Sequence, residues 1–95
     1  MTATLIIRDR SEGPRGRVVE IVVWRLSEPV PPCSHCFKYR LVLVISGQRR
    51  VGFDNERGKG DHRHIRGQEL PYEFLSIEQL FKDFYREVDQ CLDEL

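Results

Sequence analysis

The sequence has no long hydrophobic run, and no basic segment followed by an apolar one stands at its N-terminus. A membrane-spanning helix needs about 20 predominantly apolar residues, and a signal peptide needs that basic and apolar order. We therefore expect no membrane span and, by default, a cytoplasmic location. A chain of 95 residues is predicted to form a single domain, residues 1–95, around one modest core.

Cysteine is scarce, and its odd count of three argues against a disulfide framework. Cys33 and Cys36 have the spacing of a zinc knuckle, but a structural zinc site usually takes four ligands in two pairs. The sequence offers no second pair, because Cys91 falls within the apolar pattern of a helix. We therefore expect no metal and no cofactor, and we interpret Cys33 and Cys36 as ordinary loop residues.

Net charge is also absent, since 15 Lys and Arg residues balance 15 Asp and Glu residues. The charges are unevenly placed, because residues 1–68 carry 13 basic and 7 acidic residues and residues 69–95 carry 2 and 8. A basic part of this kind is compatible with nucleic-acid binding, although the whole chain is far from strongly basic. The alternative is a surface on which charge is simply unevenly distributed.

Four segments rich in β-branched and other apolar residues are predicted to be strands, and they cover residues 3–8, 17–26, 37–45 and 49–54. Glycine and proline mark the connections between them. In residues 37–45 the core-facing side chains alternate with a second set that includes Lys38 and Arg40, which places these two cations on the opposite face. Trp24 and Tyr39 are interpreted as core residues rather than as surfaces for base stacking.

A helix is predicted at the C-terminal end. From Ile77 to Leu95, apolar residues recur every three or four positions and form one stripe. Ser76 is placed as the N-cap, and Gln79 completes a capping box. Four strands and a helix with short connections predict an α+β fold, an antiparallel sheet of about four strands with the C-terminal helix packed on one face. The other face is left free for RNA, for a partner protein or for a second subunit.

Residues 54–64 form a polar run without any apolar residue, and this run contains His62 and His64. In an extended segment the two imidazoles project to one side, and Asp61 and Arg63 project to the other. Neighbouring imidazoles titrate near neutral pH and can act as general base and general acid. Metal-free RNA cleavage needs such a pair, because one group takes the 2′-hydroxyl proton and another protonates the leaving 5′-oxygen. The pair therefore predicts a catalytic site, and a flexible charged loop is the alternative.

Several other side chains are candidates to support this chemistry. Asp61 or Asp54 could orient a histidine, and we assign Asp61 to the catalytic set with His62 and His64. The candidate phosphate or RNA ligands are cationic or aromatic: His35, Lys38, Arg40, Arg57, Lys59, Arg63 and Tyr72. A His-x-His pair with a nearby Asp can also bind zinc or manganese, but a third and a fourth ligand are not evident from the sequence.

Three stretches of the chain form a recognisable pattern. They are Ser34-His35 with Phe37-Lys38-Tyr39-Arg40-Leu41, the run from Asp54 to His64, and Pro71-Tyr72-x-Phe74. Together they resemble the TumE family of prokaryotic toxins, from Val22-Val23-Trp24 to the helix, although Cys33 and Cys36 depart from the pattern. The resemblance implies a small cytoplasmic toxin that is neutralised by an antitoxin protein encoded beside it. The implied antitoxin is a winged-helix DNA-binding protein.

Three functional hypotheses follow from these residues. The first is a metal-independent RNA endonuclease that uses His62 and His64 as general acid and base. The second is a non-catalytic module whose basic residues, 57–66, bind a nucleic acid or an acidic partner surface. The third is a metal-dependent nuclease or a nucleotide-transferring enzyme. A homodimer is a further expectation, because a small sheet with one covering helix leaves a face to bury.

Overall fold

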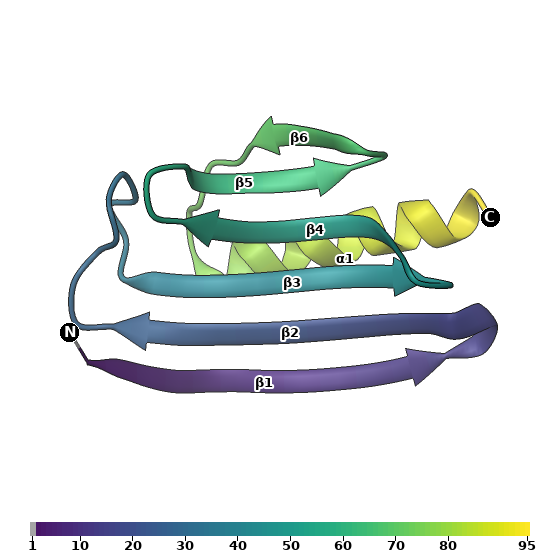
Figure 1. Cartoon of the computed structure of the whole chain (residues 1–95), viewed down its shortest axis with the longest axis horizontal. Coiled ribbons are helices and arrows are strands. Elements are labelled where there is room, and N and C mark those ends of the chain that lie inside the picture. Colours follow the sequence, from purple (N-terminus) through teal and green to yellow (C-terminus); the bar gives the residue numbers. More distant parts are fainter. Residues whose placement is uncertain (1) are drawn as a thin grey trace.

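Each strand of the sheet pairs with the strand that follows it in the sequence, so the six strands lie in chain order (Figure 1). The computed structural model describes residues 2–95. The strands are β1 (Ala3–Gly13), β2 (Arg17–Leu26), β3 (Phe37–Ile45), β4 (Gln48–Glu56), β5 (Gly60–Ile65) and β6 (Gln68–Pro71). A short 3-10 helix, Pro14–Gly16, links β1 to β2, and the helix α1 (Ile77–Asp93) follows β6. All five strand pairings are antiparallel.

The structure confirms the predicted α+β class, the antiparallel sheet and the C-terminal helix. The expectation of about four strands was too low, because the sheet formed by residues 2–95 contains six. The two additional strands, β5 and β6, lie in a segment where polar residues conceal the strand pattern. Along β5, histidines alternate with charged residues, so the usual alternation of apolar and polar residues is missing.

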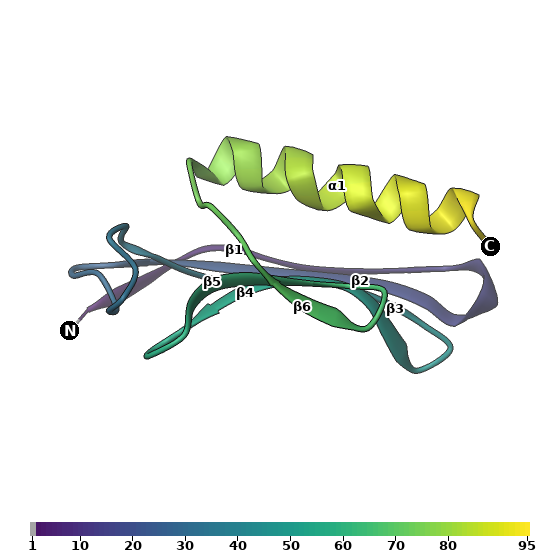
Figure 2. The same ribbon diagram turned by 90° about the horizontal axis from the view of Figure 1, so that it is seen from above.

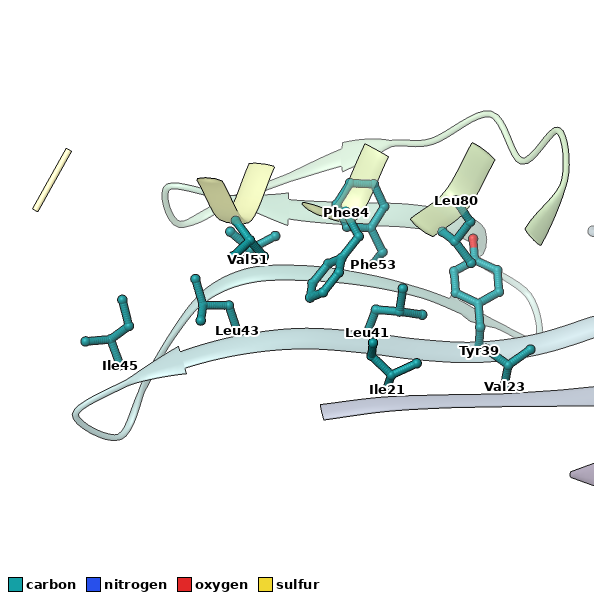
Figure 3. Close-up of a cluster of buried hydrophobic side chains, with 11 residues drawn as sticks. Ile21, Val23, Tyr39, Leu41, Leu43, Ile45, Val51, Phe53, Leu80 and Phe84 are labelled. Atoms are coloured by element: carbon teal, nitrogen blue, oxygen red, sulfur yellow. The ribbon is translucent and has the colours of Figure 1, made fainter. Parts of the chain in front are cut away.

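The helix α1 lies across one face of the sheet (Figure 2). The hydroxyl of Ser76 accepts a hydrogen bond of 3.0 Å from the backbone N–H of Gln79, which is the predicted N-cap. Leu80 and Phe84 are fully buried against the sheet, where Phe84 meets the ring of Phe53 edge-on at 6.1 Å (Figure 3). Burial of side chains this large contributes about 1.5–3 kcal/mol each. No helix in the described part of the chain is long and apolar enough to cross a membrane.

The sheet side of the core comes from alternate residues of the central strands. Its members are buried and face α1: Ile21, Val23, Tyr39, Leu41, Leu43, Ile45, Val51 and Phe53. Tyr39 is therefore a core residue, as predicted. The same prediction was wrong for Trp24, because Trp24 pairs with Lys38 and lies on the opposite face. Alternation along β2 had allowed either placement, since apolar residues occupy both of its faces.

The second face of the sheet is the one that α1 does not cover, and we call it the open face (Figure 2). One row of paired residues crosses it, with Val22 on β2, Arg40 on β3, Asp54 on β4 and His62 on β5. Because direct partners on neighbouring strands project to the same side, this row brings a cation, a carboxylate and an imidazole side by side. The open face therefore carries the polar residues that the sequence singled out.

Candidate functional site

The hairpin of β4 and β5 brings the two histidines together with Asp54. Its turn contains Gly58 and precedes Gly60, and both glycines have a positive φ, 84° and 79°, which favours glycine over other residues. The register pairs Asp54 with His62 and Gly52 with His64. Both imidazoles therefore lie on the open face, on either side of the position where the Asp54 carboxylate reaches them.

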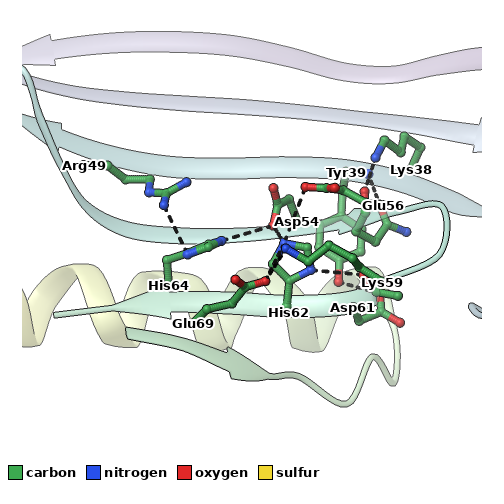
Figure 4. Close-up of polar contacts among 12 residues, drawn as sticks. Lys38, Tyr39, Arg49, Asp54, Glu56, Lys59, Asp61, His62, His64 and Glu69 are labelled. Carbon is green, nitrogen blue, oxygen red and sulfur yellow. Dashed lines mark hydrogen bonds and ion pairs between the residues drawn. The ribbon is translucent and has the colours of Figure 1, made fainter. Parts of the chain in front are cut away.

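The two rings converge on one carboxylate oxygen (Figure 4). Nε2 of His62 is 2.5 Å from Oδ1 of Asp54, and Nε2 of His64 is 3.9 Å from the same oxygen. The ring centroids are 5.2 Å apart, and the ring planes are nearly perpendicular at 83°. The side chain of His62 is 6% exposed, whereas those of His64 and Asp54 are 18% and 20% exposed. The site is therefore a cluster that reaches solvent mainly through His64 and Asp54.

The other ring nitrogens have partners that fix where the ring protons lie. Nδ1 of His62 is 3.2 Å from the carbonyl oxygen of Gly60, and it must carry a proton because a carbonyl only accepts. Nδ1 of His64 accepts a hydrogen bond of 3.1 Å from the guanidinium of Arg49, so the proton of this neutral ring is on Nε2. Burial, and then the charge of Arg49, lower the pKa of His64 below its ordinary value of 6.5. His64 is therefore neutral at pH 7.

One buried pair in this site has no well-aligned hydrogen bond. Oδ1 of Asp54 and Nε2 of His62 are both buried and lack such a partner, although they lie close to each other. Two acceptors this close repel each other unless a proton or a cation lies between them. Buried polar groups are nearly always satisfied, so this pair, like the buried Nε of Arg63 on the helix side, needs an explanation, and a bound ion or a chemical role is one.

Charges of both signs surround the cluster on the open face. Nζ of Lys59 is 2.5 Å from Oε1 of Glu69, and this contact raises the pKa of Lys59 and lowers the pKa of Glu69. Oε1 of Glu69 and Oε1 of Glu56 lie 3.8 Å and 3.9 Å from Nε2 of His62. Lys38 donates to the backbone carbonyl of Asn55 at the edge of the site. The rim thus carries cations that can contact an anion and carboxylates that lie close to His62.

Asp61 belongs to a second cluster on the helix side of β5. Its Oδ1 accepts from Nε2 of His35 at 2.8 Å and from the Tyr39 hydroxyl at 2.6 Å, while its Oδ2 accepts from Sγ of Cys33 at 3.5 Å. Burial, and then Asp61, raise the pKa values of Cys33 and Tyr39, so both remain protonated donors. Nδ1 of His35 accepts from the backbone N–H of Phe37 at 3.2 Å. Every polar atom named here has a partner.

The structure thus separates the predicted site residues into two groups. His62 and His64 meet on the open face, and Lys38, Arg40 and Lys59 border the same face. Four others lie on the helix side of the sheet or in the loop packed there, and they are His35, Asp61, Arg63 and Tyr72. Arg57 lies in the exposed turn between β4 and β5.

Two members of the cluster were not in the assigned set. Asp54 had been named only as the alternative to Asp61, and it is Asp54 that lies against the histidines, while Arg49, which contacts His64, had not been named. A signal for Asp54 was present, because a hairpin centred on Gly58 pairs residues at equal distances from that glycine, and Asp54 and His62 are each four positions away. Arg49 had no such signal, because the pairing of β3 and β4 shifts register between Leu43 and Val44.

Among residues 2–95, two groups of three side chains have potential metal ligands within 4.8 Å of one another. They are Asp54, His62 and His64 on the open face, and Cys33, His35 and Asp61 on the helix side. Three ligands leave an open position, as in catalytic metal sites. The second group is already satisfied by its own hydrogen bonds, so only the first has ligand atoms without partners.

Comparison with known proteins gives one match. The family model described as Toxin TumE matches residues 2–92. No curated protein and no solved structure matches the chain. The matched segment includes all six strands, both histidine clusters and most of α1. The chain therefore belongs to the TumE family of toxins.

Proposed function

We propose that this toxin cleaves RNA without a metal ion, with His62 and His64 as the acid–base pair and Asp54 as the carboxylate that orients them. The observation that carries the proposal is the convergence of both imidazoles on Oδ1 of Asp54, on the open face of the sheet. Two titratable groups in different environments are what a general acid and a general base require.

The different surroundings of the two histidines support different roles, one as the base and the other as the acid. His64 is the neutral ring, so it acts as the base that takes the proton from the 2′-hydroxyl. Its Nδ1 becomes free to accept this proton when Arg49 moves its N–H groups to the phosphate, a ligand that a guanidinium binds strongly. His62 carries a proton on Nδ1, and a proton shared between its Nε2 and Oδ1 of Asp54 would satisfy both buried atoms and suits the acid role.

The bond changes follow from these roles. The 2′-oxygen, once deprotonated by His64, attacks the adjacent phosphorus, and the bond from phosphorus to the 5′-oxygen breaks. His62 gives its Nε2 proton to the leaving 5′-oxygen. The products are a 2′,3′-cyclic phosphate and a 5′-hydroxyl. Arg40, Arg49 and Lys59 stabilise the charge that builds up on the phosphate oxygens, because they lie beside the same carboxylate and histidines.

A toxin of this family has a cognate antitoxin. We infer that this antitoxin is a winged-helix DNA-binding protein and that the toxin acts on RNA in the cytoplasm. We also infer a homodimer formed through β1, which is an edge strand of the sheet. Leu5 and Ile6 on β1 are 42% and 44% exposed, and an exposed apolar edge favours pairing with another strand.

The test is cleavage of single-stranded RNA by the purified toxin in the presence of EDTA. We expect ends that carry a cyclic phosphate or a 3′-phosphate, and cleavage that His62→Ala or His64→Ala reduces by about 10²–10⁴-fold. A DNA strand of the same sequence is the control, because it lacks the nucleophilic hydroxyl. A toxin that binds RNA tightly but never cuts it would refute the proposal.

A metal-dependent nuclease is the second candidate, and the unpaired atoms of Asp54 and His62 favour it. A divalent ion held by Asp54, His62 and His64 would satisfy both atoms, and imidazole and carboxylate ligands suit zinc or manganese. Arg49 opposes this candidate, because its cation contacts the third ligand directly. Loss of cleavage in EDTA, with recovery on addition of zinc or manganese, would select this mechanism over the first.

The non-catalytic hypothesis loses much of its geometric basis. It requires residues 57–66 to form one basic surface, but β5 divides them between two faces. Arg63 lies on the helix side beside Phe53, and Arg66 pairs with Glu94 beyond the end of α1. A His62→Gln toxin that keeps full toxicity would restore this hypothesis.

A further inference from the structure

A hollow lies on the open face beside the histidine cluster. Its volume is about 310 Å³, and residues from β2, β3 and β4 line it: Val22, Trp24, Lys38, Tyr39, Arg40, Asp54 and Glu56. Asp54 belongs to both the hollow and the histidine cluster, because its carboxylate is 2.5 Å from His62. The hollow is therefore continuous with the proposed active site.

Trp24 gives the hollow an aromatic surface outside the core. It is the only tryptophan of the chain, and it pairs with Lys38 on the open face. The guanidinium of Arg8 lies over its ring, with Cζ 5.9 Å from the ring centroid. Arg8 reaches the indole from β1, and the hollow extends from the indole across β3 to β4. Because Trp24 lies on the face that no helix covers, its ring is not part of the core and can offer an apolar surface to a ligand.

The charges around the hollow fit a nucleotide. Lys38 and Arg40 flank it from β3 and can hold the phosphates next to a bound base. Glu56 is half exposed at 50% and can accept a hydrogen bond from the amino group of a base. The hollow thus offers an apolar floor, two cations and two carboxylates, of which Asp54 belongs to the histidine cluster and Glu56 is free to accept from a base.

The distance between Trp24 and the histidines suits one strand of RNA. Trp24 is on β2 and His62 is on β5, three strands away. Neighbouring strands are about 4.8 Å apart, so the separation across the sheet is roughly 14 Å. A few nucleotides of an extended single strand span such a distance, and the path runs over Arg40 and Asp54.

We propose that this hollow is a subsite for an unpaired base of single-stranded RNA, with Trp24 as the stacking surface and Lys38 and Arg40 as the phosphate ligands. The inference rests on the proposed function, since it names the substrate class of the same site. It makes the toxin selective for single strands, because a base inside a duplex is already stacked and cannot enter the hollow.

Tryptophan fluorescence tests the subsite directly, because the emission comes from Trp24 alone. The probe is a short single-stranded oligonucleotide with 2′-O-methyl groups, which cannot be cleaved because the nucleophile is blocked. We expect a saturable change in emission with this strand, and none with an abasic strand or with the same sequence in a duplex. No change in emission at saturating strand, or the same change with the abasic strand, would overturn the proposal.

Paired variants separate stacking from folding. Trp24→Phe keeps a stacking ring, whereas Trp24→Leu removes it, and stacking of one base on an aromatic ring is worth about 1–3 kcal/mol. We therefore expect Trp24→Leu to weaken binding of the labelled single strand at least about fivefold, and Trp24→Phe to bind nearly as the parent does. Binding of the abasic strand should be the same in all three proteins. A Leu variant that binds the single strand as tightly as the parent contradicts the subsite.

A second pair of variants tests the phosphate ligands. Arg40→Gln should weaken binding and reduce its salt dependence, because the strand then displaces fewer counterions. Arg25→Gln is the matched control, because Arg25 is next to Trp24 on β2 but projects to the opposite face. Equal effects of the two substitutions would show that only net charge matters, and would overturn the assignment.

The inference and the proposed function can fail separately. If the parent toxin cuts RNA in EDTA and Trp24→Leu binds and cuts equally well, the subsite is wrong and the nuclease stands. If the parent never cuts RNA but the single strand still changes the emission of Trp24, the subsite stands and the nuclease is wrong. If the emission responds to the antitoxin and to no nucleic acid, the hollow is a protein-docking surface and the proposal fails.

Discussion

Two clusters with the same kinds of residue lie on opposite sides of β5, and they differ in how completely their polar atoms are hydrogen-bonded. On the helix side, Asp61 accepts from His35, Tyr39 and Cys33, and no polar atom of that group lacks a partner. On the open face, Asp54 and His62 approach to 2.5 Å without an aligned hydrogen bond. Residue type alone does not distinguish the two clusters. The number of satisfied hydrogen bonds does, because a saturated group has no free atom to offer a ligand.

The largest expected difference between the clusters is in catalysis. His62→Ala should lower kcat/KM for RNA cleavage by about 10²–10⁴-fold, which is the usual contribution of a general acid or base. His35→Ala changes the histidine of the saturated cluster, so it should lower the melting temperature while the folded protein still cuts RNA. The measurements are cleavage in EDTA and thermal unfolding of both variants. If His62→Ala and His35→Ala lose cleavage to the same extent and are equally stable, the two clusters do not differ in the way that we propose.

The next effect is on stability and concerns the two carboxylates. Asp61→Ala leaves three donors without their acceptor, and an unsatisfied buried donor costs about 1–3 kcal/mol. We therefore expect the free energy of unfolding in urea to fall by about 3 kcal/mol or more, a large part of the roughly 5–15 kcal/mol that stabilises a small domain. A stable but inactive Asp61→Ala toxin would reverse the roles that we assign to the two clusters.

Asp54→Asn is the complementary change on the open face. The amide has the shape of the carboxylate but no charge and only one acceptor oxygen, so it orients the two histidines less well, and misplaced catalytic groups should lower kcat by about 100-fold. Stability should change little, because the replaced oxygen has no aligned hydrogen bond to lose. Cleavage assays measure the change in kcat, and urea unfolding of the same preparation measures the change in the free energy of unfolding. A marked loss of stability in this variant would show that the pair of Asp54 and His62 is structural.

The smallest expected effect is a shift in pH dependence. Burial and Arg49 lower the pKa of His64 below 6.5, so below that pH the unfolded chain binds more protons than the folded one. Stability is therefore fully present above pH 6.5 and falls as the pH drops towards the lowered pKa. Arg49→Gln should raise the pKa of His64 and move the acid limb of the cleavage profile to higher pH.

A titration of the imidazole protons by NMR measures the pKa of His64 in this variant. Arg50→Gln is its matched control, because it removes the same charge at the next residue without removing a contact to His64. An unchanged titration of His64 in Arg49→Gln would contradict the assigned role of that guanidinium.

The elements with a regular apolar pattern could be predicted from the sequence. The bounds of β2 and β3 agree with residues 17–26 and 37–45, and Ser76 caps α1 as expected. The strand predicted at residues 3–8 extends to Gly13, because its second half is polar and pairs along an exposed edge. β5 and β6 were missed for a related reason, since most of their side chains are polar or charged and show no regular apolar pattern.

The site could be predicted only as far as local periodicity extends. Alternation along an extended segment correctly separated His62 and His64 from Asp61 and Arg63. Which carboxylate meets the histidines depends on the pairing of β4 with β5, and pairing is a non-local property that no single strand reveals. Trp24 was assigned to the core for the same reason, because an apolar strand gives no indication of which face a helix will cover.

The histidine cluster is built within a single hairpin, and its geometry depends on the length of the turn between Asp54 and His62. Inserting one residue into this turn would shift β5 by one position and exchange its two surfaces. Asp61 and Arg63 would then face outward, and His62 would lie beneath the helix. The number of residues in this one turn thus determines which side chains of β5 the toxin exposes on the open face. Changes in the length of the turn are therefore far less tolerable than changes in its composition.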